Sequence, residues 1–405
     1  MKKLKIVIVD STNHMELIGG GHLFLPALIK GITGRGHEVH LVVKGKPNPR
    51  IAGQISESGA IMHERPWKHN GIMEDVAPVF AKWVNAMKPD VYVVSSSFDI
   101  GWVALPLLDA SIPAVTIAHS NADGFYLPTL HYGPFITTAV GVSNEICEKY
   151  ISVSKLQPSQ VKWVPYGVRA AATLPEPGNE GPLRMIYAGR IEEGDKRISD
   201  VAAIILKLEK RGMDFKFTIA GDGSLFETIK QKLAGPIASG NVNMTGWVEG
   251  DAVLNMLGQH HIFILTSSSE GFSIALTEAM ANGCCPVVTD IPSGSVQLIR
   301  NGQSGYLLPV GDIDAFAEKL DLLNIDRALL NELRQASWET GREFSTDRMA
   351  ETYITCFVEA KEKIVASSKP VDPAFPLMDS CRSKYPNWIR RLKFFAERLR
   401  LIKAA

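Results

Sequence analysis

The sequence predicts an α/β protein built from two doubly wound parallel sheets. Short apolar runs of strand length alternate with helical stretches along most of the chain, which is the pattern of consecutive βαβ units. The chain has 405 residues, more than one hydrophobic core usually organises, so two domains are expected. Residues 165–182 are rich in proline and glycine, as an interdomain linker would be.

The first half of the chain opens with a glycine-rich βαβ unit. Residues 4–9 are expected to form a buried strand, followed by a turn with Gly20 and Gly21, a helix over 22–31 and a second strand over 39–43. Glycines in the first turn of such a unit let the backbone approach a phosphate closely. A plain tight loop would have the same composition, so both readings stay open.

His119 is the candidate ligand-binding side chain of this half. Further strands are expected at 90–95, 114–118 and 138–142. His119 directly follows the second of these, at the carboxyl edge where doubly wound sheets bind ligands. A lone histidine is more often structural, so this position alone does not establish a role.

The composition excludes several functional classes. The 43 Lys and Arg residues balance 43 Asp and Glu residues, so no global field attracts nucleic acid. The five cysteines have no paired spacing, which favours reduced thiols in a cytoplasmic protein over disulfides or zinc. No apolar run is long enough to cross a membrane, and the run 6–9 is a first strand rather than a signal peptide. We expect no metal and no bound cofactor.

The second half opens with a strand over 183–189 and a cationic loop. Arg190 and Lys196 lie on this loop, where two cations can neutralise a diphosphate, although solvated surface charge is the ordinary alternative. Trp247 follows a later strand and could stack on a base or pack in the core.

The most informative stretch is 260–310. A short strand over 261–265 and a helix over 274–281 enclose a loop that carries Glu270, and Glu278 lies inside the helix. Ser273 is the expected N-cap of this helix. A phosphate at the helix start, with a carboxylate to each side for sugar hydroxyls, would suit a sugar nucleotide. Either glutamate alone could instead complement the helix dipole or remain solvated.

This stretch resembles the donor half of the retaining glycosyltransferase family 4, which has the GT-B fold. Glu270 and Glu278 are separated by seven residues, and Ala-Met-Ala-Asn-Gly (279–283), Pro-Val-Val-Thr-Asp (286–290) and Asn-Gly-Gln-Ser-Gly-Tyr-Leu-Leu-Pro (301–309) follow. The resemblance covers about residues 4–366. It implies two Rossmann-like domains that face each other across a cleft.

The resemblance also assigns roles to the donor residues. Gly189, Arg190 and Lys196 would clamp the diphosphate, and Glu278 would bind the ribose. Glu270 and His119 would contact the donor sugar. The remaining implied donor contacts are Gly20, Gly21, Trp247, the backbone of Val248, Gly271, Phe272, Ser273 and Ile274.

The chain departs from the family pattern at three loops. Arg190 and Lys196 are one residue further apart than usual, and Arg197 stands where a glycine is frequent. Residues 166–169 read Tyr-Gly-Val-Arg where relatives commonly have Asn-Gly-Val-Asp. The loop 291–297 lacks the frequent acid.

The C-terminal 25 residues suggest a basic amphipathic helix. Trp388, Leu392, Phe395, Leu399 and Ile402 repeat at steps of four and three. Eight basic residues and one acid, Glu397, lie between 382 and 403. Such a helix could bind an anionic membrane surface or pack its apolar stripe on the protein.

These patterns predict six segments. They are an acceptor domain (1–168), a linker (169–182), a donor domain (183–342), a crossover helix (343–366), a Pro-rich linker (367–380) and the basic tail (381–405).

The sequence therefore predicts a metal-independent retaining hexosyltransferase of polysaccharide biosynthesis. The donor would be a nucleotide sugar, with a UDP-sugar favoured over GDP-mannose, and the acceptor a glycan, a lipid-linked sugar or a small molecule. We expect it in the cytoplasm, or peripherally on the inner face of the membrane. A sugar-nucleotide epimerase and a silent sugar-nucleotide binder at the membrane are the alternatives. A hydrolase with a carboxylate pair is a weaker third, because a glutamate on a nucleotide-binding helix is a poor nucleophile.

Overall fold

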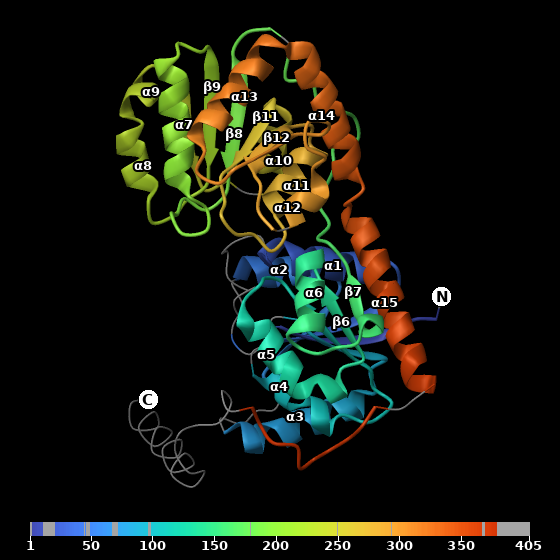
Figure 1. The fold of residues 1–405 in the computed structure, drawn as a ribbon. Helices are drawn as coiled ribbons and strands as arrows, with labels where there is room; N and C mark the ends of the chain where they lie inside the picture. The colour runs from blue at the N-terminus through green and yellow to red at the C-terminus, as the bar shows by residue number, and fades with distance from the viewer. Residues whose placement is uncertain are drawn as a thin grey trace. The chain divides into compact units, whose positions relative to one another are not determined.

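A computed structural model describes most of the chain in two compact units. The described residues are 2–10, 21–43, 45, 49–66, 72–95, 99–178, 180–248, 250–292, 294–366 and 369–378. Described residues up to Val164 and from Ala350 onward form the N-terminal unit, and Pro165–Met349 form the second unit. Figure 1 traces the chain through both.

The N-terminal unit is built on a parallel sheet of seven strands in the order β3-β2-β1-β4-β5-β6-β7. The chain order reverses between β1 and β4, and this is the switch point at which such sheets bind ligands. Its strands are β1 (Lys5–Asp10), β2 (Glu38–Val43), β3 (Ile61–Glu64), β4 (Val91–Val94), β5 (Ala114–Ala118), β6 (Thr138–Gly141) and β7 (Val161–Trp163).

Helices lie on both sides of this sheet. The five inner strands are almost fully buried, whereas the edge strands β3 and β7 are partly exposed. The principal helices are α1 (Gly21–Thr33), α2 (Pro49–Glu57), α3 (Met73–Met87), α4 (Ile100–Val103), α5 (Asp123–Tyr132), α6 (Asn144–Ser152) and α15 (Thr346–Ala366), with short 3-10 turns at η2 (Leu105–Leu107), η3 (Gly133–Phe135) and η4 (Pro158–Gln160). Two ion pairs fasten α15 to the sheet. Lys162 and Glu359 are 2.8 Å apart, and Lys361 pairs with Asp90.

The second unit contains a parallel sheet of six strands in the order β10-β9-β8-β11-β12-β13, with the switch point between β8 and β11. These two sheets confirm the predicted fold class. The strands are β8 (Leu183–Ala188), β9 (Phe215–Ala220), β10 (Val242–Gly246), β11 (Ile262–Leu265), β12 (Cys285–Thr289) and β13 (Tyr306–Leu308).

The helices of the second unit are α7 (Ile198–Lys210), α8 (Phe226–Lys232), α9 (Ala234–Ala238), α10 (Asp251–Gly258), α11 (Ile274–Ala281), α12 (Gly294–Leu298), α13 (Ile313–Ile325) and α14 (Arg327–Arg342). Helices α11 and α14 pack with their backbones in contact. A Cβ on Gly341 of α14 would lie 2.3 Å from the backbone nitrogen of Ala281, so only glycine permits this approach.

Residues 369–378, inside the segment predicted as a Pro-rich linker, pack on the N-terminal unit. The Phe375 ring lies 4.8 Å from the ring of Phe135 and 5.8 Å from that of Tyr132. Lys369 is 7% exposed, and its ammonium donates to the carbonyls of Leu105 and Leu108. Burial lowers the pKa of Lys369 to about 8. The predicted basic tail (381–405) lies outside the described residues.

Replacing Phe375 tests how firmly this segment is held. Phe375→Ala should lower the free energy of unfolding by about 1–2 kcal/mol, because the half-buried ring loses its aromatic contacts. A thermal melt measures the loss as a lower Tm. The control is Val371→Ala on the same segment, whose side chain is 44% exposed and whose loss should leave the melt unchanged. Equal melts for both variants would show that the aromatic contacts do not hold the segment.

Candidate functional site

The switch point of the second unit gathers the predicted phosphate-binding and sugar-binding side chains. Arg190 follows β8, and Glu270 lies on the loop that follows β11. These two strands are neighbours, so their carboxyl ends share one edge of the sheet. Lys196 comes to the same edge because its loop is bonded to the end of β11, through Thr266 Oγ1, which donates to the carbonyl of Lys196 over 3.2 Å.

Lys196 and Glu270 are in direct contact. The Lys196 ammonium lies 2.5 Å from Oε1 of Glu270, and their side chains are only 16% and 11% exposed. Ser267 Oγ donates to the same carboxylate oxygen over 2.7 Å. A half-buried pair with a third hydrogen-bonding partner is fixed far more firmly than a surface pair. The sequence assigned these two residues to different parts of the donor, and the structure brings them together.

Arg190 is more exposed and is paired differently. Its guanidinium forms an ion pair with Glu192, and the two side chains are 38% and 37% exposed. Its backbone is held in place, since the Tyr187 hydroxyl donates to the carbonyl of Arg190 over 2.6 Å. Solvent screens the Arg190–Glu192 pair, so an entering phosphate could replace the glutamate at small cost.

Gly221 and Gly223, on the turn after β9, allow the Arg190 loop to pack closely against that turn. Gly221 has φ +146°, and a Cβ there would stand 1.9 Å from the carbonyl oxygen of Gly189. A Cβ on Gly223 would stand 2.5 Å from the carbonyl oxygen of Ile191. The backbones of the two loops are bonded at this point, with the Ile191 amide donating to the Asp222 carbonyl over 2.9 Å. The Arg190 loop therefore packs directly on the turn that follows β9.

The start of α11 is capped as predicted. Ser273 Oγ accepts from the Leu276 amide over 3.4 Å. Phe272 is 5% exposed and packs between Tyr166 and Phe344, so its predicted donor contact would have to come from its backbone. The predicted Ile274 is likewise buried, whereas Gly271 is half-buried.

Glu278 is half-buried on α11, and its ionisation is perturbed. Burial raises its pKa to about 7, against the opposing charge of Arg169. A carboxyl that titrates near neutrality is sensitive to what binds beside it.

Trp247, on the loop before α10, is 44% exposed. This exposure excludes core packing, and base stacking stays a prediction. Val248 beside it is half-buried.

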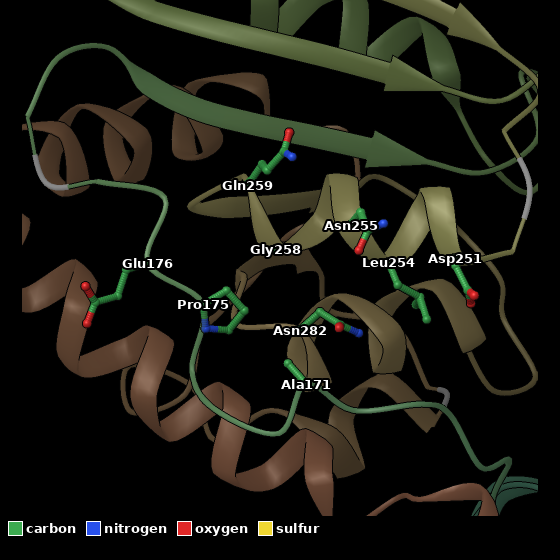
Figure 2. A pocket seen from close by; sticks show the side chains of 9 residues that line it. All are labelled: Ala171, Pro175, Glu176, Asp251, Leu254, Asn255, Gly258, Gln259 and Asn282. Atoms are coloured by element: carbon green, nitrogen blue, oxygen red, sulfur yellow. The ribbon is translucent and has the colours of Figure 1, made fainter.

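A groove of about 500 Å³ lies between α10 and the segment 171–176, with Asn282 in its lining. In Figure 2 Asn282 lies at the end of α11, and Asp251 and Asn255 extend from α10. Acids and amides line its rim, and Pro175, Leu254 and Ala171 contribute apolar surface.

The N-terminal unit contributes one of the predicted side chains at its own switch-point edge. His119 follows β5, and its Nε2 shares a hydrogen bond of 3.1 Å with Ser95 Oγ, at the end of β4. The Phe24 ring packs edge-on against His119 at 4.9 Å. Gly21 is the first residue of α1, whereas Gly20 lies outside the described residues.

Two polar residues at this edge, Ser95 and Asp10, are not among the residues predicted from the sequence. Asp10 is the last residue of β1 and is 2% exposed, at the same edge as Ser95. The signal that could have found both is their position, since each polar residue ends an apolar strand.

Two family models match the chain. One, described as Glycosyltransferase Family 4, matches residues 18–171, and the other, Glycosyl transferases group 1, matches residues 174–343. The chain belongs to glycosyltransferase family 4.

Curated relatives of this family 4 chain include transferases of different sugars. It is 24% identical over 297 residues to the UDP-N-acetylglucosamine–peptide N-acetylglucosaminyltransferase GtfA subunit of Streptococcus pneumoniae, covering 68% of this chain and 58% of the relative. It is 24% identical over 326 residues to the phosphatidyl-myo-inositol mannosyltransferase of Mycolicibacterium smegmatis, covering 75% and 81%. The chain thus spans little more than half the length of the pneumococcal relative.

Solved structures share its fold. A glycosyltransferase from Rickettsia africae superposes with a TM-score of 0.73 at 16% identity, covering 91% of this chain and 100% of that one. Anabaena Alr3699/HepE, solved with UDP and glucose, superposes with a TM-score of 0.72 at 14% identity, covering 88% and 99%. At these identities the likeness establishes the GT-B fold.

Two features are absent from the part of the chain that the structure describes. No group of three or more His, Cys, Asp or Glu side chains is arranged to hold a metal ion. Among the helices described, none combines the length and the apolar character that a membrane crossing requires.

Adding one methyl group should test the loop contact beneath Arg190. Gly223→Ala forces a Cβ against the Ile191 backbone, so we expect the second unit to lose on the order of 1–3 kcal/mol of stability. Chemical denaturation measures this loss. Gly235→Ala is the matched control, because nothing outside its own helix turn lies within 4 Å of its added Cβ. A Gly223→Ala variant as stable as this control would mean that the two loops can separate without cost.

Proposed function

We propose that this chain is a retaining glycosyltransferase that moves a sugar from a nucleotide-sugar donor to an acceptor. The contact between Lys196 and Glu270 at the switch point of the second unit carries the proposal. The matches to two glycosyltransferase family models support the proposal, and Arg190 lies at the same edge of the sheet. The ammonium of Lys196 could bind the phosphates of a glycosyl diphosphate, and the carboxylate of Glu270 could accept hydrogen bonds from its sugar.

The proposed chemistry is electrostatic. As the bond between the anomeric carbon and the diphosphate breaks, negative charge grows on the departing phosphate oxygens. Lys196 and Arg190 would stabilise this charge, since preorganised cations act most strongly where charge develops. They would supply the charge that a metal ion supplies elsewhere, so the reaction is proposed to be metal-independent.

Glu270 and Glu278 would orient the donor. The carboxylate of Glu270, held by Lys196 and Ser267, would accept hydrogen bonds from the donor sugar's hydroxyls. Glu278 would accept from the ribose. The acceptor would attack the face that the leaving group occupies, which retains the anomeric configuration without a protein nucleophile.

For the donor we favour a UDP-sugar. The GtfA relative is named for UDP-N-acetylglucosamine, and the HepE structure contains UDP. The mannosyltransferase relative is the reason to test GDP-sugars as well. For the acceptor we propose a glycan, lipid-linked or small molecule, because relatives include a colanic acid biosynthesis enzyme and a phosphatidyl-myo-inositol mannosyltransferase.

The N-terminal unit is the proposed acceptor domain, with His119 at the edge that would meet the donor sugar. The second unit is the proposed donor domain. We place the enzyme in the cytoplasm or peripherally on the inner face of the membrane, with residues 381–405 as the proposed membrane-binding segment.

Removing one cation tests the clamp. Lys196→Ala should lower kcat by about 100-fold or more with the donor that a thermal-shift screen of UDP-, GDP- and ADP-sugars identifies. Lys207→Ala removes a partly exposed lysine that pairs with Asp314 in the same unit, and it should keep full activity. Wild-type turnover by Lys196→Ala would contradict the mechanism.

Incubation with the donor alone separates a transferase from an epimerase, because only the epimerase would convert the donor to another sugar nucleotide.

A further inference from the structure

The loop 166–169, where this chain departs from the family pattern, is built into the second unit by backbone contacts on both sides. The Val168 amide donates to the Phe344 carbonyl over 2.8 Å. A Cβ on Gly167 would stand 2.6 Å from Cα of Thr346, so the loop approaches the chain there without a side chain between them. On the other side, the Ala171 amide donates to the carbonyl of Ala281, the last residue of α11, over 3.0 Å. The backbone of Arg169 therefore has a fixed position.

Arg169 joins two helices of the donor site. Asn282 Nδ2 donates to the Arg169 carbonyl over 3.1 Å and to the Glu278 carbonyl over 2.8 Å, which ties the loop to the last turn of α11. The Arg169 guanidinium pairs with Asp251, the first residue of α10. Helix α10 follows the loop that carries Trp247, which is predicted to stack on the base, and Val248, whose backbone is a predicted donor contact. Asp251 and Asn282, the two partners of Arg169, both line the groove shown in Figure 2.

The guanidinium also acts on Glu278. Two elements that pack against α11 carry other charged groups, Asp251 on α10 and Arg334 on α14. Asp251 is paired with Arg169, and Arg334 donates to the carbonyls of Gly283 and Pro175. Arg169 is the charge that opposes the effect of burial on Glu278. An aspartate at position 169, as in the common family pattern, would repel both Asp251 and Glu278.

We infer that Arg169 is a positioning residue of the donor site, which joins the first turn of α10 to the helix α11 that carries Glu278. Its charge also favours the ionised form of Glu278. This inference rests on the proposed function. The ion pair itself adds little to stability, because its side chains are 58% and 77% exposed. Arg169 variants should therefore fold, and their effect on Glu278 can be measured directly.

The first experiment needs no ligand. Carbon-13 NMR of the glutamate carboxyls, assigned with Glu278→Gln, gives the titration midpoint of Glu278 in the whole chain. Because a nearby cation favours the charged form, Arg169→Ala should raise this midpoint by roughly one pH unit. Arg169→Lys should restore it, and Arg211→Ala, which removes another arginine paired with an aspartate in this unit, should leave it unchanged. Coincident midpoints for Arg169→Ala and the wild type would overturn the inference.

The second experiment measures the dissociation constants of UDP and GDP by calorimetry from pH 6 to 9. Ribose hydroxyls donate to the charged form of Glu278, so wild-type affinity should fall as the pH drops through about 7. A rise of roughly one unit in the midpoint leaves about a tenth of Glu278 charged at pH 7, which predicts a roughly fivefold weaker Kd for Arg169→Ala there. The Kd values of the wild type and Arg169→Ala should converge at pH 9. The affinity of Glu278→Gln should not change with pH in this range, because the titrating carboxyl is gone.

The two experiments separate two failures. An equal loss of affinity by Arg169→Ala at every pH would overturn the charge effect even if the enzyme binds UDP normally. Failure of the wild type to bind either nucleotide would contradict the proposed function, while the NMR midpoints would still decide whether Arg169 controls Glu278.

Discussion

The contact between Lys196 and Glu270 is the interaction on which the proposed site depends. It joins two loops that are 74 residues apart in the chain, and both loops leave neighbouring strands of one parallel sheet. The parallel arrangement makes this meeting possible, since both strands end at the same edge. An ammonium and a carboxylate held this closely in a half-buried position form a preorganised dipole. A bound glycosyl diphosphate would meet charges that need little reorganisation.

Close backbone approach is the second constraint. At Gly221, Gly223 and Gly341 a single methyl group would collide with main-chain atoms of the neighbouring element. Glycine gives conformational freedom to the unfolded chain and therefore has an entropic cost on folding. Here that cost is offset by loops and helices that lie against each other without intervening side chains. The position of Arg190 follows from this packing, because its loop lies directly on the turn of Gly221 and Gly223.

Local patterns predicted the fold, which the two sheets confirm, and the edge of the sheet where the proposed site lies, because both follow from the order of strands and helices. They could not predict which side chains meet. The Lys196 loop reaches Glu270 through a bond from Thr266 and turns at Arg197, a non-glycine residue with φ 48°, and neither feature can be read from local composition. Phe272 lies within the predicted donor motif, but its ring is directed into the core by Tyr166 and Phe344, which are distant in sequence. The proline-rich composition of 367–380 likewise indicates a linker, whereas Phe375 packs on aromatic residues more than 200 positions earlier.

The packed segment 369–378 has a consequence for everything that follows it. Its last residue is bound to the N-terminal unit, where the Met378 amide donates to the Tyr132 hydroxyl over 3.3 Å. Residues beyond it begin from a fixed point on that unit rather than from the free end of α15. A surface or molecule captured by those residues would be confined to the vicinity of the N-terminal unit, at an effective concentration set by the length of a short tether. The proposed acceptor domain would then encounter such a molecule far more often than free diffusion allows.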